Sequence, residues 1–242
     1  LDILQGSSVL FTGGGGFLLS YFVDLIATLN SQLNLNIKLD IYDYFYNGFP
    51  NRLNKYKKNQ NIKFYNLDVS KKIKLVDEYS LIIHGASIAS PTYYKKFPIE
   101  TIKVNTIGLL NLLDFYKESK KLKNFIYMSS SEVYGDPSPA SVPTKEDYNG
   151  NVSFTGPRAC YDESKRIGET ISINYFKIHK LPIKIIRPFN VYGPGQNIDD
   201  KRIIPDLIKF IKNNKNIEMY SDGKPKRSFC YISDQIRGIL EV

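Results

Sequence analysis

The chain has 242 residues, of which 42% are hydrophobic and 24% are charged. This composition excludes an intrinsically disordered, collagen-like or coiled-coil protein, and the length allows one large domain or one domain with part of a second. The formal net charge is +9, but only seven of the 33 basic residues are Arg, and the Lys residues are spread along the whole chain. We therefore expect solvated Lys side chains and no nucleic-acid partner.

Short β-rich runs alternate with longer stretches of helical periodicity. Strands are expected at Ser8–Thr12, Ile37–Tyr42, Ile62–Tyr65, Leu81–His84, Phe125–Ser129 and Ile183–Arg187, and helices at Gly16–Leu33, Ile99–Lys120 and Tyr161–His179. Continuously apolar strands that alternate with helices indicate an α/β protein with a parallel sheet covered on both faces. We therefore predict a Rossmann-type, doubly wound sheet whose ligand lies beyond the carboxyl ends of the strands.

The first strand leads into a glycine-rich turn, Thr12-Gly13-Gly14-Gly15-Gly16. Glycines at this place permit a tight turn and let backbone N–H groups approach a pyrophosphate at the helix N-terminus, although plain loops use them too. Asp43 ends the second strand, where a carboxylate binds the ribose hydroxyls and repels a 2′-phosphate, so NAD is predicted rather than NADP. Leu19 stands where a third small residue is expected, so either the helix lies further out or its neighbours are smaller.

Two further strand ends carry polar residues. Asp68 and Val69 follow the third strand, where they can face the adenine, or Asp68 can cap a following helix. His84 ends the fourth strand, and we interpret it as a packed, hydrogen-bonded histidine rather than an acid or base.

Tyr161 and Lys165 lie four residues apart at the start of a predicted helix, so both side chains project from one face. An ammonium group beside a phenol lowers the pKa of the phenol and makes Tyr a general base near neutral pH. This spacing is common by chance. It gains weight from Ser129-Ser130-Ser131-Glu132, which follows the fifth strand, because a hydroxyl group there can share the substrate oxygen with Tyr161.

The alternating pattern of apolar strands and helices changes around Pro188. A turn-rich segment at Asn190–Gly195 precedes a helix at Ile203–Lys212 and a strand near Ile217–Tyr220. We predict a first domain over residues 1–187 and a smaller substrate lobe over residues 188–242. Because the chain begins with Leu1 and ends within an expected helix, we expect a fragment whose substrate lobe is truncated at its C-terminus.

No run of the sequence reaches the ~18 apolar residues of a membrane span, since Phe17–Leu29 is interrupted by Asp24. No signal peptide is visible either, so we expect a cytoplasmic protein without a membrane partner. Cys160 and Cys230 are isolated and lack ligand spacing, so neither a metal site nor a disulfide framework is predicted.

Four blocks of the chain resemble the extended short-chain dehydrogenase/reductase family that acts on nucleotide sugars. These blocks are Gly13–Phe17, Ser130–Pro137, Tyr161-x-x-x-Lys165 and Arg187–Pro194. Within that family, three segments are similar to the UDP-glucuronate decarboxylases, namely Ser131–Pro137, Gly156–Arg166 and Arg227–Asp234. The similarity spans nearly the whole chain.

The resemblance implies an enzyme that uses NAD catalytically and regenerates it in each turnover. It places NAD against Gly13, Gly16, Phe17, Leu18, Asp43, Asp68, Val69, Ser87 and Lys165. Tyr161 would take the proton of the sugar 4-hydroxyl, and Ser130 would hydrogen-bond the same oxygen. The resulting 4-keto sugar would lose its carboxylate as carbon dioxide, converting UDP-glucuronate to UDP-xylose, with Glu132 and Arg227 managing the carboxylate and the proton at C5. The nucleotide sugar would bind Lys103, Asn190, Arg202 and Arg227.

Other readings stay open at this point. A 4,6-dehydratase uses an Asp-Glu pair where this chain has Ser131-Glu132, and a hydroxyl is too weak an acid to replace that Asp, so dehydration is disfavoured. A 4-epimerase and an NAD-binding relative without turnover are both compatible with these residues. The chain departs from the family at Leu19, at Gly85, where Leu is usual, and at Gly195-Gln196, where Arg is common. Relatives pair through two helices, so a homodimer that uses Tyr161–His179 is expected.

Overall fold

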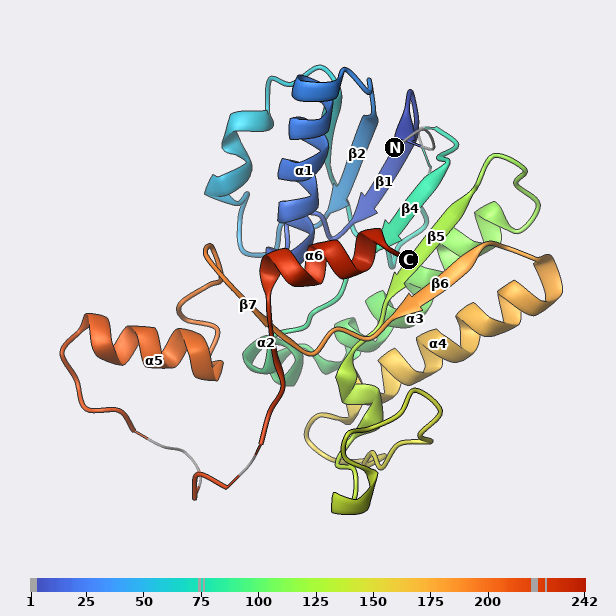
Figure 1. Ribbon diagram of the computed structural model, residues 1–242. Helices are drawn as coiled ribbons and strands as arrows, with labels where there is room; N and C mark the ends of the chain where they lie inside the picture. Colours follow the sequence, from blue (N-terminus) through green and yellow to red (C-terminus); the bar gives the residue numbers. More distant parts are fainter. Residues whose placement is uncertain (1–3, 74, 76, 219–221, 225) are drawn as a thin grey trace.

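The computed structural model describes residues 4–73, 75, 77–218, 222–224 and 226–242. Six parallel strands form one sheet in the order β3-β2-β1-β4-β5-β6 (Figure 1). Their bounds are Ser8–Thr12 (β1), Lys38–Asp43 (β2), Ile62–Asn66 (β3), Leu81–His84 (β4), Asn124–Met128 (β5) and Ile183–Ile186 (β6). The predicted Rossmann-type sheet is confirmed, with strand ends shifted by about one residue. Because the strand order reverses between β1 and β4, their carboxyl ends flank the point where doubly wound sheets bind ligands.

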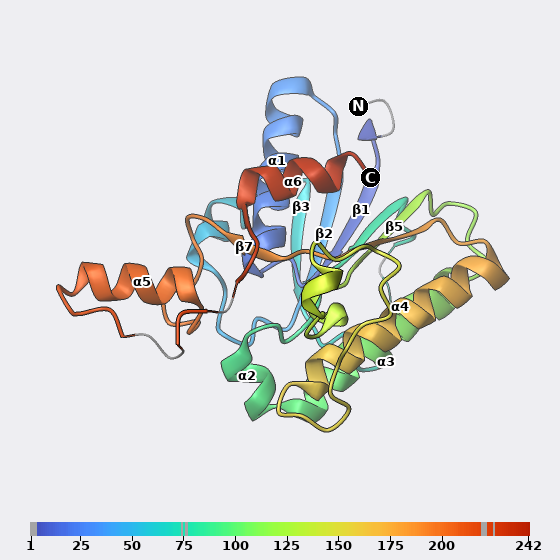
Figure 2. The same cartoon turned by 60° about the horizontal axis from the view of Figure 1, so that its bottom comes forward.

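Helices cover both faces of this sheet (Figures 1 and 2). One face carries α1 (Phe17–Leu33) and α6 (Ile232–Leu240), and the other carries α3 (Pro98–Tyr116) and α4 (Ala159–His179). Helix α1 buries Leu19, Phe22, Val23 and Ile26, a spacing that places all four side chains on one stripe toward the sheet. Ile239 of α6 is buried in the same hydrophobic core, so the end of the chain packs onto the first part of the molecule.

The segment after β6 contributes two short strands that the sequence pattern did not reveal. β7 (Asn190–Tyr192) pairs in parallel with β8 (Phe229–Tyr231), so the turn-rich segment predicted at Asn190–Gly195 begins as a strand. Three-residue strands are too short to show an alternating pattern. The strand predicted near residues 217–220 is wrong for Ile217 and Glu218, which lie in no strand, and its remainder lies outside the described residues.

Short helices stand at several points of the carboxyl edge and its loops. These are α2 (Pro91–Lys96), α5 (Ile203–Lys212) and the 3₁₀ helices η2 (Asn51–Tyr56), η3 (Ser131–Tyr134) and η4 (Pro139–Ser141). Helix α5 stands apart from the sheet in Figure 1, and Pro205 is its one buried residue. Over the described ranges, no helix combines the length and the apolar character that a membrane crossing requires.

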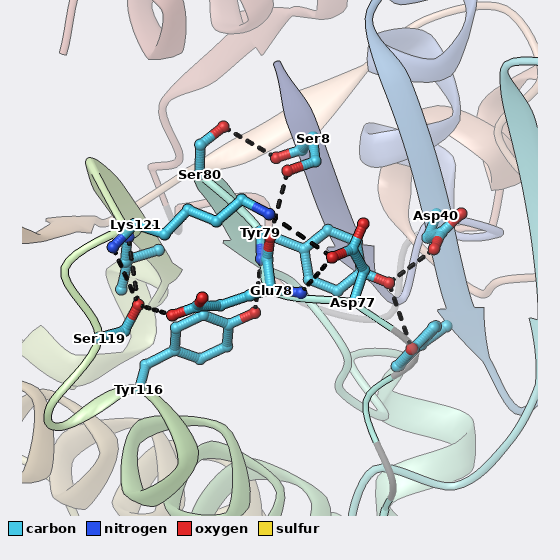
Figure 3. Close-up of polar contacts among 11 residues, drawn as sticks. Ser8, Asp40, Asp77, Glu78, Tyr79, Ser80, Tyr116, Ser119 and Lys121 are labelled. Atoms are coloured by element: carbon cyan, nitrogen blue, oxygen red, sulfur yellow. Dashed lines mark hydrogen bonds and ion pairs between the residues drawn. The ribbon is translucent and has the colours of Figure 1, made fainter. Parts of the chain in front are cut away.

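A polar network closes the opposite, amino end of the sheet (Figure 3). The Tyr79 hydroxyl donates to Asp40 Oδ2 at 2.6 Å, and the Tyr79 N–H donates to the Tyr116 hydroxyl at 2.9 Å. Ser80 Oγ donates to the Ser8 carbonyl at 3.0 Å and so joins the start of β4 to β1. This end of the sheet is filled by its own side chains, which leaves the carboxyl end as the place for a ligand.

Candidate active site

The glycine turn packs tightly over the carboxyl end of β1. Gly13 has a φ of +75°, and a Cβ at this position would lie 2.7 Å from the backbone of Ala86. Glycine is therefore required here on both conformational and steric grounds. The turn delivers the chain to the first turn of α1, which has neither a capping side chain nor an acidic residue. A helix N-terminus of this kind is suited to a phosphate group.

Asp43 links the end of β2 to this turn. Its Oδ2 accepts the N–H of Gly15 at 2.9 Å, and its Oδ1 accepts the N–H of Phe45 at 2.7 Å. Burial raises the pKa of Asp43, while the two backbone hydrogen bonds oppose that shift. Each carboxylate oxygen keeps a further lone pair, so the side chain is fixed in place and can still accept a ribose hydroxyl.

Two departures from the family pattern contact each other. A Cβ on Gly85 would lie 2.7 Å from Leu19 Cδ1, so the space that a larger residue would need at position 85 is filled by Leu19. Leu19 itself is buried in the core. Of the two explanations considered for a bulky residue 19, the smaller neighbour is confirmed, because the missing side chain at position 85 makes room for it.

The other residues expected near NAD differ in what they present. Asp68 Oδ1 accepts both the N–H and the hydroxyl of Ser70, and the described residues that directly follow it, 69–73, form no helix. The helix-cap alternative is therefore wrong, although the residue does stabilise a turn. Val69 is buried against Gly108 of α3, so its side chain belongs to the core. Phe17 and Leu18 form the first turn of α1.

Ser87 and His84 complete the edge beside the turn. Ser87 Oγ is buried and has no hydrogen-bond partner among the described residues, as expected for a group that awaits a ligand. His84 Nδ1 lies 2.6 Å from Thr12 Oγ1, and burial lowers the pKa of His84 to about 3, which confirms a neutral, packed histidine. The glycine turn, Asp43 and the unpartnered Ser87 hydroxyl together fit a dinucleotide.

Tyr161 is buried at the start of α4 and stacks on Tyr94. The ring centroids are 5.2 Å apart and the planes meet at 14°. Lys165 Nζ donates to the Met128 carbonyl at 2.7 Å and lies 5.9 Å from the centroid of the Tyr161 ring. The structure thus brings Tyr161 and Lys165 together at the carboxyl end of β5, together with Ser130, whose hydroxyl lies near enough to lower the pKa of Tyr161.

Burial dominates the electrostatics of this group. It raises the pKa of Tyr161, and the groups that oppose this shift are Ser130, through its hydroxyl group, and Arg202, through its charge. Burial also lowers the pKa of Lys165 to about 7, because a fully buried ammonium is itself destabilised. The expectation that Lys165 lowers the pKa of Tyr161 stays a prediction.

Glu132 has a partner that the sequence analysis did not name. It lies on η3, and its Oε2 contacts the Nη2 of Arg158, the residue that precedes α4. On its other side, Arg158 Nε lies 3.6 Å from Asp162 Oδ2. Arg227, the other residue expected to act on the substrate carboxylate, is exposed and donates to the neighbouring carbonyl of Lys226.

The remaining residues expected to bind substrate are spread over α3 and the segment after β6. Arg202 Nη2 donates to the Ala89 carbonyl at 3.0 Å and its charge reaches Tyr161, so the structure brings Arg202 to the site. Asn190 Nδ2 donates to the Ser228 carbonyl at 3.0 Å and joins β7 to the segment before β8. Lys103 is exposed on α3, and no hydrogen bond or ion pair within the described part of the chain joins it to Tyr161.

Arg158 and Asp162 were missed as site residues. They flank Tyr161 at three residues before and one after, within the block Gly156–Arg166, so their nearness in sequence was the available signal. Tyr94, one of the aromatics that the sequence offered either for a ligand wall or for the core, reaches Tyr161 because the fold brings α2 against α4. In the described residues, no group of three or more His, Cys, Asp or Glu could hold a metal ion, and both cysteines are free thiols.

Comparisons with known proteins agree with this geometry. A family model described as "NAD dependent epimerase/dehydratase family" matches residues 9–242. UDP-glucuronic acid decarboxylase 6 of Arabidopsis thaliana is 37% identical over 234 residues, which cover 97% of this chain and 65% of the plant protein. The chain thus spans less than two thirds of that relative's length.

Solved structures show the same fold. A UDP-glucuronic acid 4-epimerase from Bacillus cereus in complex with NAD has a TM-score of 0.79 at 28% identity, covering 96% of this chain and 72% of the other. A UDP-N-acetylglucosamine 4-epimerase from Methanobrevibacter ruminantium has a TM-score of 0.82 at 26% identity, covering 97% and 72%. The chain belongs to the NAD dependent epimerase/dehydratase family.

Proposed function

We propose that this chain carries the catalytic part of an NAD-dependent UDP-glucuronate decarboxylase, which forms UDP-xylose. The observation that carries the proposal is the position of Glu132, which lies close enough to Tyr161 for its charge to raise the pKa of the phenol. A 4-epimerase needs the Tyr and Ser hydroxyls but no carboxylate at this point. The 37% identity to a plant UDP-glucuronic acid decarboxylase supports the same assignment.

NAD would lie along the carboxyl edge of the sheet. The glycine turn and the first turn of α1 would hold its pyrophosphate, Asp43 its adenosine ribose, and Ser87 and Lys165 its nicotinamide half. When bound, NAD supplies a hydride acceptor for C4 of the sugar and returns the hydride later, so the reaction has no net redox change.

Tyr161 and Ser130 act on the oxygen at C4. As a phenolate, Tyr161 Oη takes the 4-hydroxyl proton while Ser130 hydrogen-bonds the same oxygen. Ser130 and Arg202 favour the phenolate, since both lower the pKa of Tyr161 against the effect of burial. At the end of the cycle Tyr161 returns the proton to O4.

Oxidation at C4 turns the uronate into a β-keto acid. The C5–C6 bond then breaks, carbon dioxide leaves, and the electron pair remains as an enolate that takes a proton at C5. Glu132, held by Arg158, would position the carboxylate and manage this proton. Arg202 and Asn190 would bind the nucleotide sugar from the second lobe, together with Lys103 and Arg227.

A second candidate is 4-epimerisation of the same substrate. The fold similarity to the Bacillus cereus UDP-glucuronic acid 4-epimerase, with a TM-score of 0.79, favours this alternative. The two functions differ in product, because epimerisation retains the C6 carboxylate and decarboxylation releases it.

The test is incubation of the purified enzyme with UDP-glucuronate and NAD, with carbon dioxide and nucleotide sugars measured together. We expect carbon dioxide and UDP-xylose in equal amounts. Formation of the 4-epimer without carbon dioxide would replace the proposal by the second candidate. Absence of any product, with NAD bound, would indicate a relative without turnover.

A homodimer is proposed on the basis of the α3 and α4 surfaces. Both helices expose large apolar side chains that a monomer would leave in water, namely Ile99, Ile102, Ile107, Phe115, Ile167, Ile173, Phe176 and Ile178. Exposed apolar faces of this kind are typical of protein–protein interfaces.

A further inference from the structure

Three charged side chains meet beside Tyr161, and the proposed reaction uses one of them directly. Glu132 comes from η3, Arg158 precedes the first residue of α4, and Asp162 lies in the first turn of that helix. The guanidinium of Arg158 is shared between the two acids: its Nη2 contacts Glu132 Oε2, and its Nε lies 3.6 Å from Asp162 Oδ2. One planar cation therefore joins Asp162 to Glu132.

Asp162 is the most buried member of this group. Its side chain is 12% exposed, against 41% for Arg158 and 35% for Glu132. Asp162 Oδ1 is buried without a hydrogen bond to any described residue, and within the described part of the chain Asp162 forms an ion pair with Arg158 alone. Burying a carboxylate with so few partners costs free energy, so stability alone gives little reason for this residue.

Backbone hydrogen bonds fix the main chain at Arg158 but do not hold its long side chain. The Arg158 carbonyl accepts the N–H groups of Tyr161 at 2.9 Å and Asp162 at 3.1 Å. Beyond Cβ, the Arg158 side chain has several rotatable bonds, and a half-exposed Arg populates many rotamers unless its guanidinium is held. Arg158 Nε is buried without a hydrogen bond to any described residue and faces the charge of Asp162 at 3.6 Å, an attraction that favours the rotamer in which Nη2 is directed at Glu132.

We infer that Asp162 is a positioning residue of the reaction, which acts through Arg158 to fix the carboxylate of Glu132 beside Tyr161. The inference rests on the proposed function for the chemistry of Glu132. It assigns no contact between Asp162 and the substrate. Because Glu132 acts after the sugar has been oxidised, loss of Asp162 should slow carbon dioxide release more than it slows oxidation at C4.

The experiment compares Asp162→Asn with Glu163→Gln, the neighbouring acid in the same helical turn, which pairs with Arg166 at 3.5 Å. Both variants remove one negative charge from the start of α4, so a helix-dipole effect is matched. We expect Asp162→Asn to lower kcat for carbon dioxide release on the order of tenfold, with little change in KM and an increased steady-state fraction of reduced NAD. Glu163→Gln should leave all three at wild-type values.

Arg158→Lys supplies a second test, because Lys keeps the positive charge but lacks the planar guanidinium group that can contact two carboxylates at once. If Asp162 acts through Arg158, the double variant should be no slower than the slower single variant. Effects on kcat that multiply would overturn the inference, as would a wild-type kcat in Asp162→Asn or an equal loss of sugar oxidation.

A crystal structure of Asp162→Asn separates this inference from the proposed function. We expect the Arg158–Glu132 contact to be lost in it, and its retention would overturn the positioning role whatever reaction the enzyme catalyses. Failure of wild-type enzyme to release carbon dioxide would instead refute the proposed function alone.

Discussion

The contact between Leu19 and position 85 gives the sharpest test of how this chain accommodates its altered glycine turn. A Cβ on Gly85 would lie 2.7 Å from Leu19 Cδ1 and 3.3 Å from Leu19 Cγ. Carbon atoms normally approach to about 3.5–4.0 Å, so the first contact is short by about 1 Å. Gly85 is not among the positive-φ residues, so the conflict is with the neighbouring side chain and not with the backbone conformation.

Gly85→Leu should therefore destabilise the chain by about 1–3 kcal/mol through overpacking. Leu19→Gly should cost about 2–5 kcal/mol for the cavity, with about 1 kcal/mol more for glycine within a helix. The double variant exchanges the two residues, so the new Leu side chain can enter the space that Leu19 vacates. We expect it to recover about 1–3 kcal/mol relative to the sum of the single variants.

The assay is urea unfolding of the four proteins, followed by circular dichroism, with NAD binding measured on each folded variant. Gly238→Leu is the control, because a Cβ there has nothing within 4 Å, so it should not destabilise the chain and should raise the free energy of unfolding by up to about 1 kcal/mol, since Leu favours the helix more than Gly does. Strict additivity of the two single substitutions would refute the reasoning, as would a wild-type free energy of unfolding for Gly85→Leu.

Other predictions address the chemistry and the assembly. Asp43→Asn keeps the shape but removes the charge, so NAD affinity measured by calorimetry should fall about 10- to 100-fold, and unchanged affinity would remove Asp43 from the ribose site. Tyr161→Phe should lower turnover at least about 100-fold while NAD still binds, and normal turnover would contradict its role as general base. Burial lowers the pKa of Lys165 to about 7, so above pH 7 the folded chain loses a proton that the unfolded chain keeps. Thermal stability should therefore rise from pH 7 to about 9 in the wild type, and it should rise less in Lys165→Met. Phe176→Glu, at a side chain 48% exposed on α4, should convert the proposed dimer to a monomer in sedimentation, and a wild type that sediments as a monomer would contradict the dimer.

The alternation of apolar strands and helices was sufficient to predict the sheet and its ligand-binding edge. This worked because strands buried on both faces and helices with one apolar stripe differ in periodicity over many residues. The glycine turn and Asp43 could be placed for a related reason: the turn follows β1 and Asp43 ends β2, and parallel strands end at one edge. The short strands β7 and β8 escaped notice because three residues carry no periodic signal.

The roles of charged groups depended on the tertiary structure. Spacing put Tyr161 and Lys165 on one face, but the depth of burial, which raises the pKa of Tyr161 and lowers that of Lys165, is a property of the whole fold. Likewise, the sequence analysis named Glu132 without a charged partner, and the path of the chain into α4 brings Arg158 to it. Local pattern thus determined the elements and the edge at which they end, while pairing and burial were decided in three dimensions, because desolvation and charge contacts depend on residues that are distant along the chain.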